Sequence, residues 1–145
     1  MSWFRSVGVV VALVVLVVSV GCGSSSSSSS STTAPSATTY TDTFSGNVAT
    51  GGSNKDSNKF TVHQAGNISA TITKLSPLST ITIGLGLGVY DNTNNVCNLQ
   101  LFADNAKLNQ VLAASVSVAG DLCVGVYDVG NIVDSVDFEV SVTHT

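Results

Sequence analysis

The chain has 145 residues, of which 43% are hydrophobic and 10% are charged, and its formal net charge is −4. A chain of this length favours one folded domain, and so few charges are typical of a secreted or wall-associated module. Outside the N-terminal leader, four lysines stand against nine acidic residues, which excludes nucleic acid as a partner because nothing replaces the counterions of a phosphate backbone.

Residues 1–21 have the organisation of an export signal. Arg5 supplies positive charge, residues 7–20 form an apolar run, and small residues follow. The run is too short to span a membrane, since a transmembrane helix needs about 20 apolar residues. We therefore predict that residues 1–21 direct the chain out of the cytoplasm.

The segment Val18-Ser19-Val20-Gly21-Cys22 resembles a bacterial lipoprotein signal. In that family, small residues precede a cysteine that is acylated and becomes the first residue of the mature protein. Gly21 and Cys22 match the pattern, whereas Ser19 stands where the family usually has leucine. The resemblance implies a lipid on Cys22. An ordinary signal peptide cut near the same place, or a short uncleaved anchor, remains an alternative.

Residues 22–39 follow as the lipidated cysteine and a linker. Gly23 and the run Ser24 to Ser31 are too polar to fold, so this segment is predicted to be a flexible tether. As a random coil, residues 23–39 would reach about 20–25 Å. Gly23, in place of aspartate after the cysteine, resembles the pattern of outer-membrane lipoproteins. The expected location is therefore extracytoplasmic, at the outer membrane or cell surface if the cell has two membranes.

From residue 40 to residue 145 the apolar residues recur with period two, which predicts strands and excludes a helical domain. The two clearest runs are Ile81 to Val89 and Val136 to Val142. Shorter runs of the same kind, separated by turn signals, are Phe60 to Val62, Ile68 to Ile72, Cys97 to Leu101, Leu112 to Val118 and Leu122 to Val126, with Tyr40 to Val48 as an edge strand. Seven or eight such strands predict an all-β fold, an antiparallel β-sandwich. A single helical turn is expected around Asp104 to Gln110.

Five of these segments, taken in order, resemble the bacterial pre-peptidase C-terminal (PPC) domain. They are residues 60–62, 66–72, 85–90, 119–128 and 138–142. The resemblance covers about residues 58–143. It implies a jelly-roll-like sandwich that serves as an accessory appendage of secreted proteins and sometimes as a binding module. Family members usually follow a catalytic domain, and these 145 residues contain none.

Cys97 and Cys123 are the two cysteines that remain once Cys22 is assigned to lipid. An exported chain meets an oxidising compartment, so we predict that these two form a disulfide. It would stabilise the fold by roughly 3.5 kcal/mol in the chain-entropy model. Two buried free thiols are the alternative. No metal site or cofactor is expected, because zinc needs clustered ligands and the histidines are His63 and His144.

Gly84, Gly86 and Gly88 alternate inside a predicted strand, which is not the glycine loop and helix of a phosphate site. Glycines in such a strand most often mark the close approach of another backbone. If instead they lie open, they form a strip to which a partner backbone or a flat sugar ring could bind. Asp91 and Asn92 in the following turn complete this candidate binding surface. Calcium at that turn is an alternative, although the EF-hand pattern is missing.

Groups suited to catalysis are few in this sequence. The chain has two histidines and one glutamate, and no Gly-x-Ser-x-Gly nucleophile elbow. His63 alternates with Phe60 and Val62 and should be exposed, and His144 should fray with the C-terminus. We therefore predict a non-enzymatic envelope lipoprotein that binds an envelope protein or polysaccharide, or coats the envelope. A calcium-dependent carbohydrate- or matrix-binding module and a small secreted hydrolase are the alternatives.

Overall fold

The structure is a computed structural model that describes residues 36–51 and 55–145. The predicted signal sequence, Cys22 and the linker up to residue 35 lie outside the described residues. Residues 36–39 are exposed and without regular structure, and the first strand begins at Tyr40. In the part of the chain that is described, no helix is long and apolar enough to cross a membrane.

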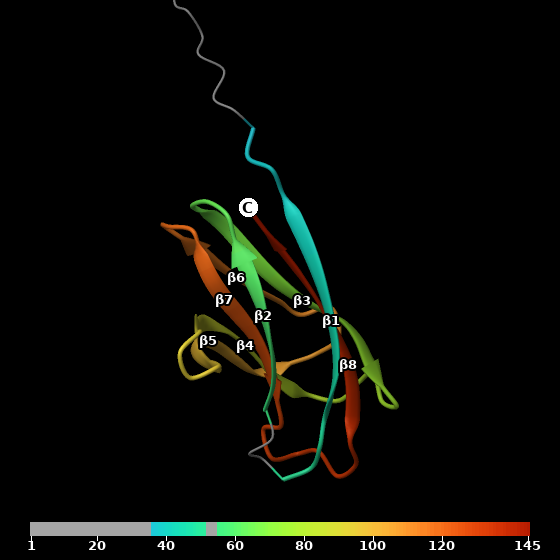
Figure 1. Cartoon of the computed structure of the whole chain (residues 1–145). Helices are drawn as coiled ribbons and strands as arrows, with labels where there is room; N and C mark the ends of the chain where they lie inside the picture. Colours follow the sequence, from blue (N-terminus) through green and yellow to red (C-terminus); the bar gives the residue numbers. More distant parts are fainter. Residues whose placement is uncertain (1–35, 52–54) are drawn as a thin grey trace, which may run out of the picture. The chain divides into compact units, whose positions relative to one another are not determined.

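Eight β-strands make up the described chain (Figure 1). In chain order they are β1 (Tyr40–Val48), β2 (Lys55–Val62), β3 (Gly66–Ser76), β4 (Ile83–Asp91), β5 (Val96–Ala106), β6 (Val111–Val116), β7 (Gly120–Tyr127) and β8 (Val136–His144). Each of the eight predicted runs corresponds to one of these strands. The period-two pattern is therefore confirmed as the signal that locates them.

The helical turn expected around Asp104 to Gln110 is wrong. β5 continues through this region and stays paired with β4 as far as Ala106, opposite Ile83. Ala106 is fully buried, so its pairing contributes to the core. Only a tight turn follows, in which the Gln110 amide donates to the Lys107 carbonyl at 2.9 Å.

The strands form two four-stranded antiparallel sheets that pack against each other. Sheet A has the order β1-β8-β3-β6, and sheet B has the order β2-β7-β4-β5. Consecutive strands β1 and β2, β2 and β3, and β3 and β4 change sheet each time, and this order is that of a jelly roll. The predicted antiparallel, jelly-roll-like β-sandwich is confirmed.

The core lies between the two sheets and is formed by every second residue of the long strands. Val140, Val142 and Ile72 in sheet A face Leu85 and Val126 in sheet B, and all five are at most 1% exposed. Burying one such side chain contributes about 1.5–3 kcal/mol. Because side chains alternate along a strand, the intervening residues must lie on the outer faces of the two sheets.

Candidate functional site

The glycines of the candidate binding surface lie on the outer face of sheet B, but two of them are covered. Gly84 and Gly86 are both buried. A Cβ on Gly84 would lie 2.1 Å from the ring of Tyr127, and a Cβ on Gly86 would lie 2.7 Å from the side chain of Leu99. The alternative of an open strip is therefore excluded at these two positions, because neighbouring side chains of the same domain fill the space.

At Gly88, the space that a side chain would fill is occupied by the backbone of β5. A Cβ at this position would lie 2.1 Å from the Asn98 carbonyl oxygen and 2.6 Å from the Leu99 Cα atom, both in β5. The register between β4 and β5 also shifts between Leu87 and Gly88. The start of β5 thus bends over the outer face of β4. This is the close backbone approach that glycine in a strand most often marks.

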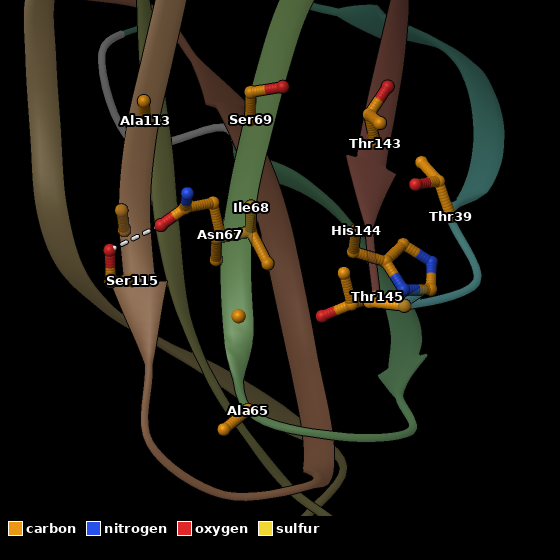
Figure 2. A pocket seen from close by; sticks show the side chains of 13 residues that line it. Thr39, Ala65, Asn67, Ile68, Ser69, Ala113, Ser115, Thr143, His144 and Thr145 are labelled. Carbon is orange, nitrogen blue, oxygen red and sulfur yellow. Dashed lines mark hydrogen bonds between the residues drawn. The ribbon is translucent and has the colours of Figure 1, made fainter. Parts of the chain in front are cut away.

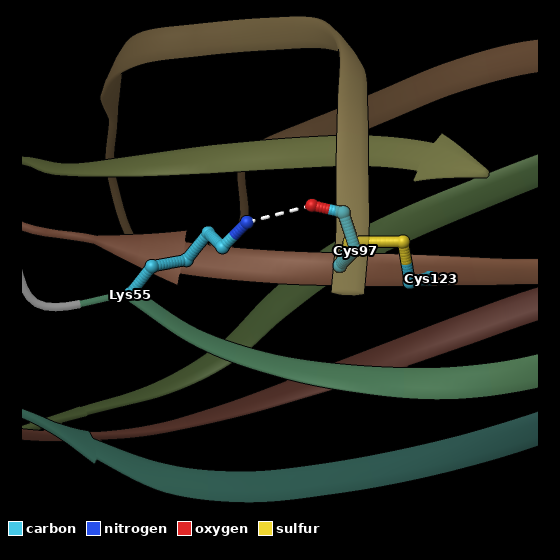
Figure 3. The surroundings of a disulfide bond; sticks show 3 residues. All are labelled: Lys55, Cys97 and Cys123. Atoms are coloured by element: carbon cyan, nitrogen blue, oxygen red, sulfur yellow. Dashed lines mark hydrogen bonds between the residues drawn. A yellow bond between two sulfur atoms is a disulfide. The ribbon is translucent and has the colours of Figure 1, made fainter. Parts of the chain in front are cut away.

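The disulfide between Cys97 and Cys123 holds this bend in place and confirms the predicted pair. The cysteines lie on β5 and β7, which are not neighbours because β4 lies between them. Two strands separated by a third would be about 9–10 Å apart in a flat sheet, whereas the two Cα atoms are 5.8 Å apart. Figure 3 shows the strand with Cys97 crossing over the others. The disulfide therefore fastens β5 across the sheet.

Lys55 reaches the same place from the opposite edge of sheet B. Its Nζ donates a hydrogen bond to the Cys97 carbonyl oxygen at 2.7 Å (Figure 3). Lys55 is in β2 and Cys97 in β5, the two edge strands of this sheet. A bond between the two edges is possible only because β5 folds over the outer face. That face is covered by the protein's own chain.

The carboxylate of Asp91 accepts hydrogen bonds from residues of its own turn. Its Oδ1 accepts hydrogen bonds from the amides of Thr93 at 2.8 Å and Asn94 at 3.2 Å, and its Oδ2 accepts one from Asn94 Nδ2 at 2.7 Å. The Asn94 side chain, followed by the Asn94 and Thr93 amides, lowers the pKa of Asp91. Asn95 completes the turn with a φ of 54°. Local side-chain to backbone bonding thus explains this turn.

Asn92 joins a polar network that ties the turn to sheet B. Asp121 accepts from Thr61 Oγ1 at 2.8 Å, from Asn92 Nδ2 at 2.7 Å and from Lys59 Nζ at 3.1 Å. These three hydrogen bonds, that of Thr61 first, lower the pKa of Asp121 to about 2. Lys59 also donates to Asn92 Oδ1 and lies 5.4 Å from the ring centroid of Tyr90. Asn92 therefore has a structural role.

The two histidines differ in their surroundings. His63 is exposed, as predicted. His144 is only 2% exposed, and the expectation that it frays is wrong, because Tyr40 pairs with it across the sheet and the His63 amide donates to the Thr145 carbonyl at 3.0 Å. His144 Nε2 lies 3.0 Å from Asp42 Oδ2.

His144 is not arranged as in a catalytic triad. Such an imidazole must link a carboxylate to a nucleophile through its two nitrogens. Nδ1 of His144 is buried and has no hydrogen-bond partner among the described residues. In the same part of the chain, no three histidine, cysteine, aspartate or glutamate side chains gather to hold a metal ion.

The outer face of sheet A carries small polar side chains, and we call it the hydroxyl face. Its members alternate with the core residues of the same strands: Thr41, Thr43, Ser45 and Asn47 in β1, Ser141 and Thr143 in β8, Asn67, Ser69, Thr71 and Thr73 in β3, and Ser115 in β6. The sheet register places them in rows, for example Thr41 opposite Thr143 and Thr143 opposite Ser69.

Hydrogen bonds between neighbouring strands order parts of this face. Ser115 Oγ donates to Asn67 Oδ1 at 2.7 Å, and the hydroxyl oxygens of Thr41 and Thr143 are 3.5 Å apart. Sequence reasoning did not identify this face as a site. The signal was present, because serine, threonine or asparagine occupies successive alternate positions of three predicted strands. Only the strand order, which brings β1, β8 and β3 together, turns these positions into one surface.

A shallow hollow of about 690 Å³ lies at one end of the hydroxyl face. Figure 2 shows Asn67, Ser69 and Thr143 along its wall, with Thr39 and Thr145 at the end where the chain enters β1 and leaves β8. These side chains offer hydroxyl and amide groups that both donate and accept hydrogen bonds. The hollow and the hydroxyl face form the candidate site.

Comparison with known proteins finds no match to this chain, either among protein-family models or among curated proteins. The function is therefore inferred from the residues and their geometry.

Proposed function

We propose that this protein is a non-enzymatic, lipid-anchored protein of the cell envelope whose sandwich binds an uncharged polysaccharide through the hydroxyl face. The observation that carries the proposal is the open row of Thr41, Thr143 and Ser69, which leads to the hollow. Hydroxyl groups act as donor and acceptor at once, as sugar hydroxyls do. This chemistry suits a neutral chain lying flat across the strands.

The charge distribution supports a neutral ligand. The two rows next to the hollow run from Thr41 and Thr43 across the sheet, end in Ala113 and Val111, and contain hydroxyl and apolar side chains but no charged residue. The acidic residues of the outer face, Asp137 and Glu139, lie at the opposite end. They accept hydrogen bonds from Asn47 and Thr73, respectively. An anionic polymer would gain nothing at the hollow, since attraction needs a charge of opposite sign.

The lipid anchor is the second part of the proposal and rests on the leader and Cys22. Substituting Cys22 with serine should move the protein from the membrane fraction to the soluble fraction and abolish labelling by fatty acid. Retention in the membrane, together with unlabelled wild type, would refute the anchor. This result is independent of the hydroxyl face, so the two parts of the proposal can fail separately.

Binding is tested with the double variant Thr71→Val and Thr143→Val in the full chain. Valine keeps the β-branched shape and removes the hydroxyl group. Loss of two hydrogen bonds of about 1 kcal/mol each should weaken co-sedimentation with insoluble, uncharged envelope polysaccharide by at least about tenfold. The matched control is Thr80→Val, an exposed threonine in the turn between β3 and β4. Equal binding by the double variant and the control would overturn the role of this face.

No observation favours the calcium-dependent module or the hydrolase. Both carboxylate oxygens of Asp91 already accept hydrogen bonds within the turn. His144 has a carboxylate beside one nitrogen and, within the described part of the chain, no partner on the other. A melting temperature that rises with calcium and falls with chelator would revive the first alternative.

A further inference from the structure

The edge of sheet A formed by β6 is unprotected. β6 pairs with β3 on one side, and among the described strands nothing pairs with its other side. Residues 111–120 contain no charged residue and no proline. Free amide and carbonyl groups along such an edge are a template for another strand, and natural proteins usually block them with lysine, proline, a bulge or an inward-pointing charge.

The other three edges of the sandwich each carry such a block. β2 has Lys55 and Lys59, and β1 directs Asp42 inward to His144. β5 has irregular register and is held over the sheet by the Cys97 disulfide. β6 is therefore the exception among the four edges.

Apolar side chains are exposed beside the same edge. Val111 is 50% exposed and Val118 is 72% exposed. A small hollow of about 140 Å³ next to β6 is lined by Val116, Leu101 and Val89, among others. Contact with a second strand at this edge would remove apolar surface from water as well as pair the backbone.

We propose that β6 pairs in antiparallel fashion with β6 of a second copy of this chain, so that the two A sheets form one continuous sheet. A two-fold axis through the edge makes the contact self-complementary, because each copy presents the same free backbone groups. The full chain has a net charge of −4, so two copies carry net charge of the same sign. The uncharged residues 111–120 provide an approach without like charges.

The charges near β6 favour the antiparallel arrangement. Antiparallel pairing places Lys107, which precedes the strand, at opposite ends of the two joined strands, whereas parallel pairing would bring the two lysines together. Asp121, which follows the strand, lies in β7 of sheet B and is already bonded to Lys59. The hydroxyl faces of the two copies would then lie on the same side of the joined sheet. This pairing is independent of whether the hydroxyl face binds a polysaccharide.

The pairing is tested by cysteine cross-linking of the full chain. Residues opposite each other in antiparallel strands have Cα atoms about 4.5–5.5 Å apart, which suits a disulfide. Val111→Cys, Ala113→Cys and Ser115→Cys are compared with Ser45→Cys, an exposed serine on β1 at the opposite edge of the same sheet. Under mild oxidation at least one β6 variant should form a disulfide-linked dimer. Ser45→Cys and the parent chain should form no disulfide-linked dimer.

A charge placed at the edge gives an independent test without oxidation. Ala113→Lys should reduce the dimeric fraction seen by analytical ultracentrifugation about fivefold, since each copy would bring a lysine to the shared edge and like charges on paired strands are destabilising. Ser45→Lys should leave that fraction unchanged. Absence of dimer in the wild type, equal loss in both variants, or cross-linking of the β6 cysteines only to a different protein would overturn the proposal. Melting temperatures of the variants exclude unfolding as the cause.

Discussion

The outer faces of the two sheets differ in residue composition and in exposure to solvent. Sheet A presents serine, threonine and asparagine to solvent, whereas sheet B presents Gly84, Gly86 and Gly88, which the protein's own β5 and side chains cover. The inner residues of both sheets follow the same apolar alternation. The difference between the faces therefore lies in the residues that alternate with the core. Small hydroxyl residues accompany an open face, and glycines accompany a covered one.

Sheet B is covered through three separate contacts. The Cys97–Cys123 disulfide joins β5 to β7, Lys55 bonds to the Cys97 carbonyl, and Asn92 anchors the β4–β5 turn on Asp121. Each contact joins residues that are distant in sequence. The hydrogen bonds on the outer face of sheet A, such as those of Thr41 with Thr143 and of Ser115 with Asn67, link directly neighbouring strands and leave the face uncovered. The covered face should thus contribute to stability, and the open face should be available for binding.

The largest effect should come from removing the disulfide. In the double variant Cys97→Ala and Cys123→Ala, the free energy of unfolding should fall by about 3.5 kcal/mol, because the unfolded chain regains the entropy of the closed loop. Urea unfolding measures this change. Cys22→Ser is the control, since it removes a cysteine outside the described domain. A double variant as stable as this control would show that the disulfide between β5 and β7 does not stabilise the fold.

A somewhat smaller loss should follow from Gly88→Ala. The new Cβ would meet the Asn98 and Leu99 backbone, and β5 would have to move away. We expect a loss of about 1–3 kcal/mol, the usual cost of forcing atoms into a packed region. Gly120→Ala is the matched control, because a Cβ there meets nothing within 4 Å. Equal urea midpoints for the two variants would contradict the close approach of β5.

Much of this fold could be predicted from local pattern. Period-two alternation located all eight strands, including the edge strand Tyr40–Val48, and export with two remaining cysteines predicted the Cys97–Cys123 pair. The strands follow from the local alternation of residues along the chain. The disulfide follows from the number of cysteines left once Cys22 is assigned to lipid. The expected helical turn near Asp104 failed because pairing of β5 with β4 extends the strand beyond its apolar run.

The candidate site could not be predicted in the same way. Whether Gly86 lies open or covered depends on Leu99, which only the bend of β5 brings over it. The hydroxyl face depends on β1, β8 and β3 being neighbours although they are far apart in the chain. His144 was expected to fray because it lies next to the C-terminus, but Tyr40, at the other end of the domain sequence, pairs with it. The order of the strands in the sheets determines the surroundings of Gly86, the hydroxyl face and His144. The alternation of residues along a strand does not reveal that order.

The Asp121 network should make part of the stability of the covered face depend on pH. The pKa of Asp121 is lowered from 3.8 to about 2, so its carboxylate stabilises the fold fully above the unfolded value of 3.8. That contribution is lost as the pH falls through about 2. Asp121→Asn should therefore lower the urea midpoint at pH 6, by less than the two changes above, and the difference from wild type should shrink toward pH 2. A difference that is constant with pH would mean that the charge of Asp121 does not matter.

The smallest effect on stability should come from the hydroxyl face. Thr71→Val with Thr143→Val keeps two β-branched residues in central strands of sheet A and alters no core position. The free energy of unfolding should change by less than about 1 kcal/mol, as is usual for surface substitutions. Urea unfolding at neutral pH checks this value beside the polysaccharide assay. A double variant that unfolds as easily as Gly88→Ala would show that sheet A, like sheet B, has an outer face committed to folding. A variant that keeps wild-type stability but no longer binds would show that the two outer faces have different functions. The residues that alternate with the core would then contribute to stability in sheet B and to ligand binding in sheet A.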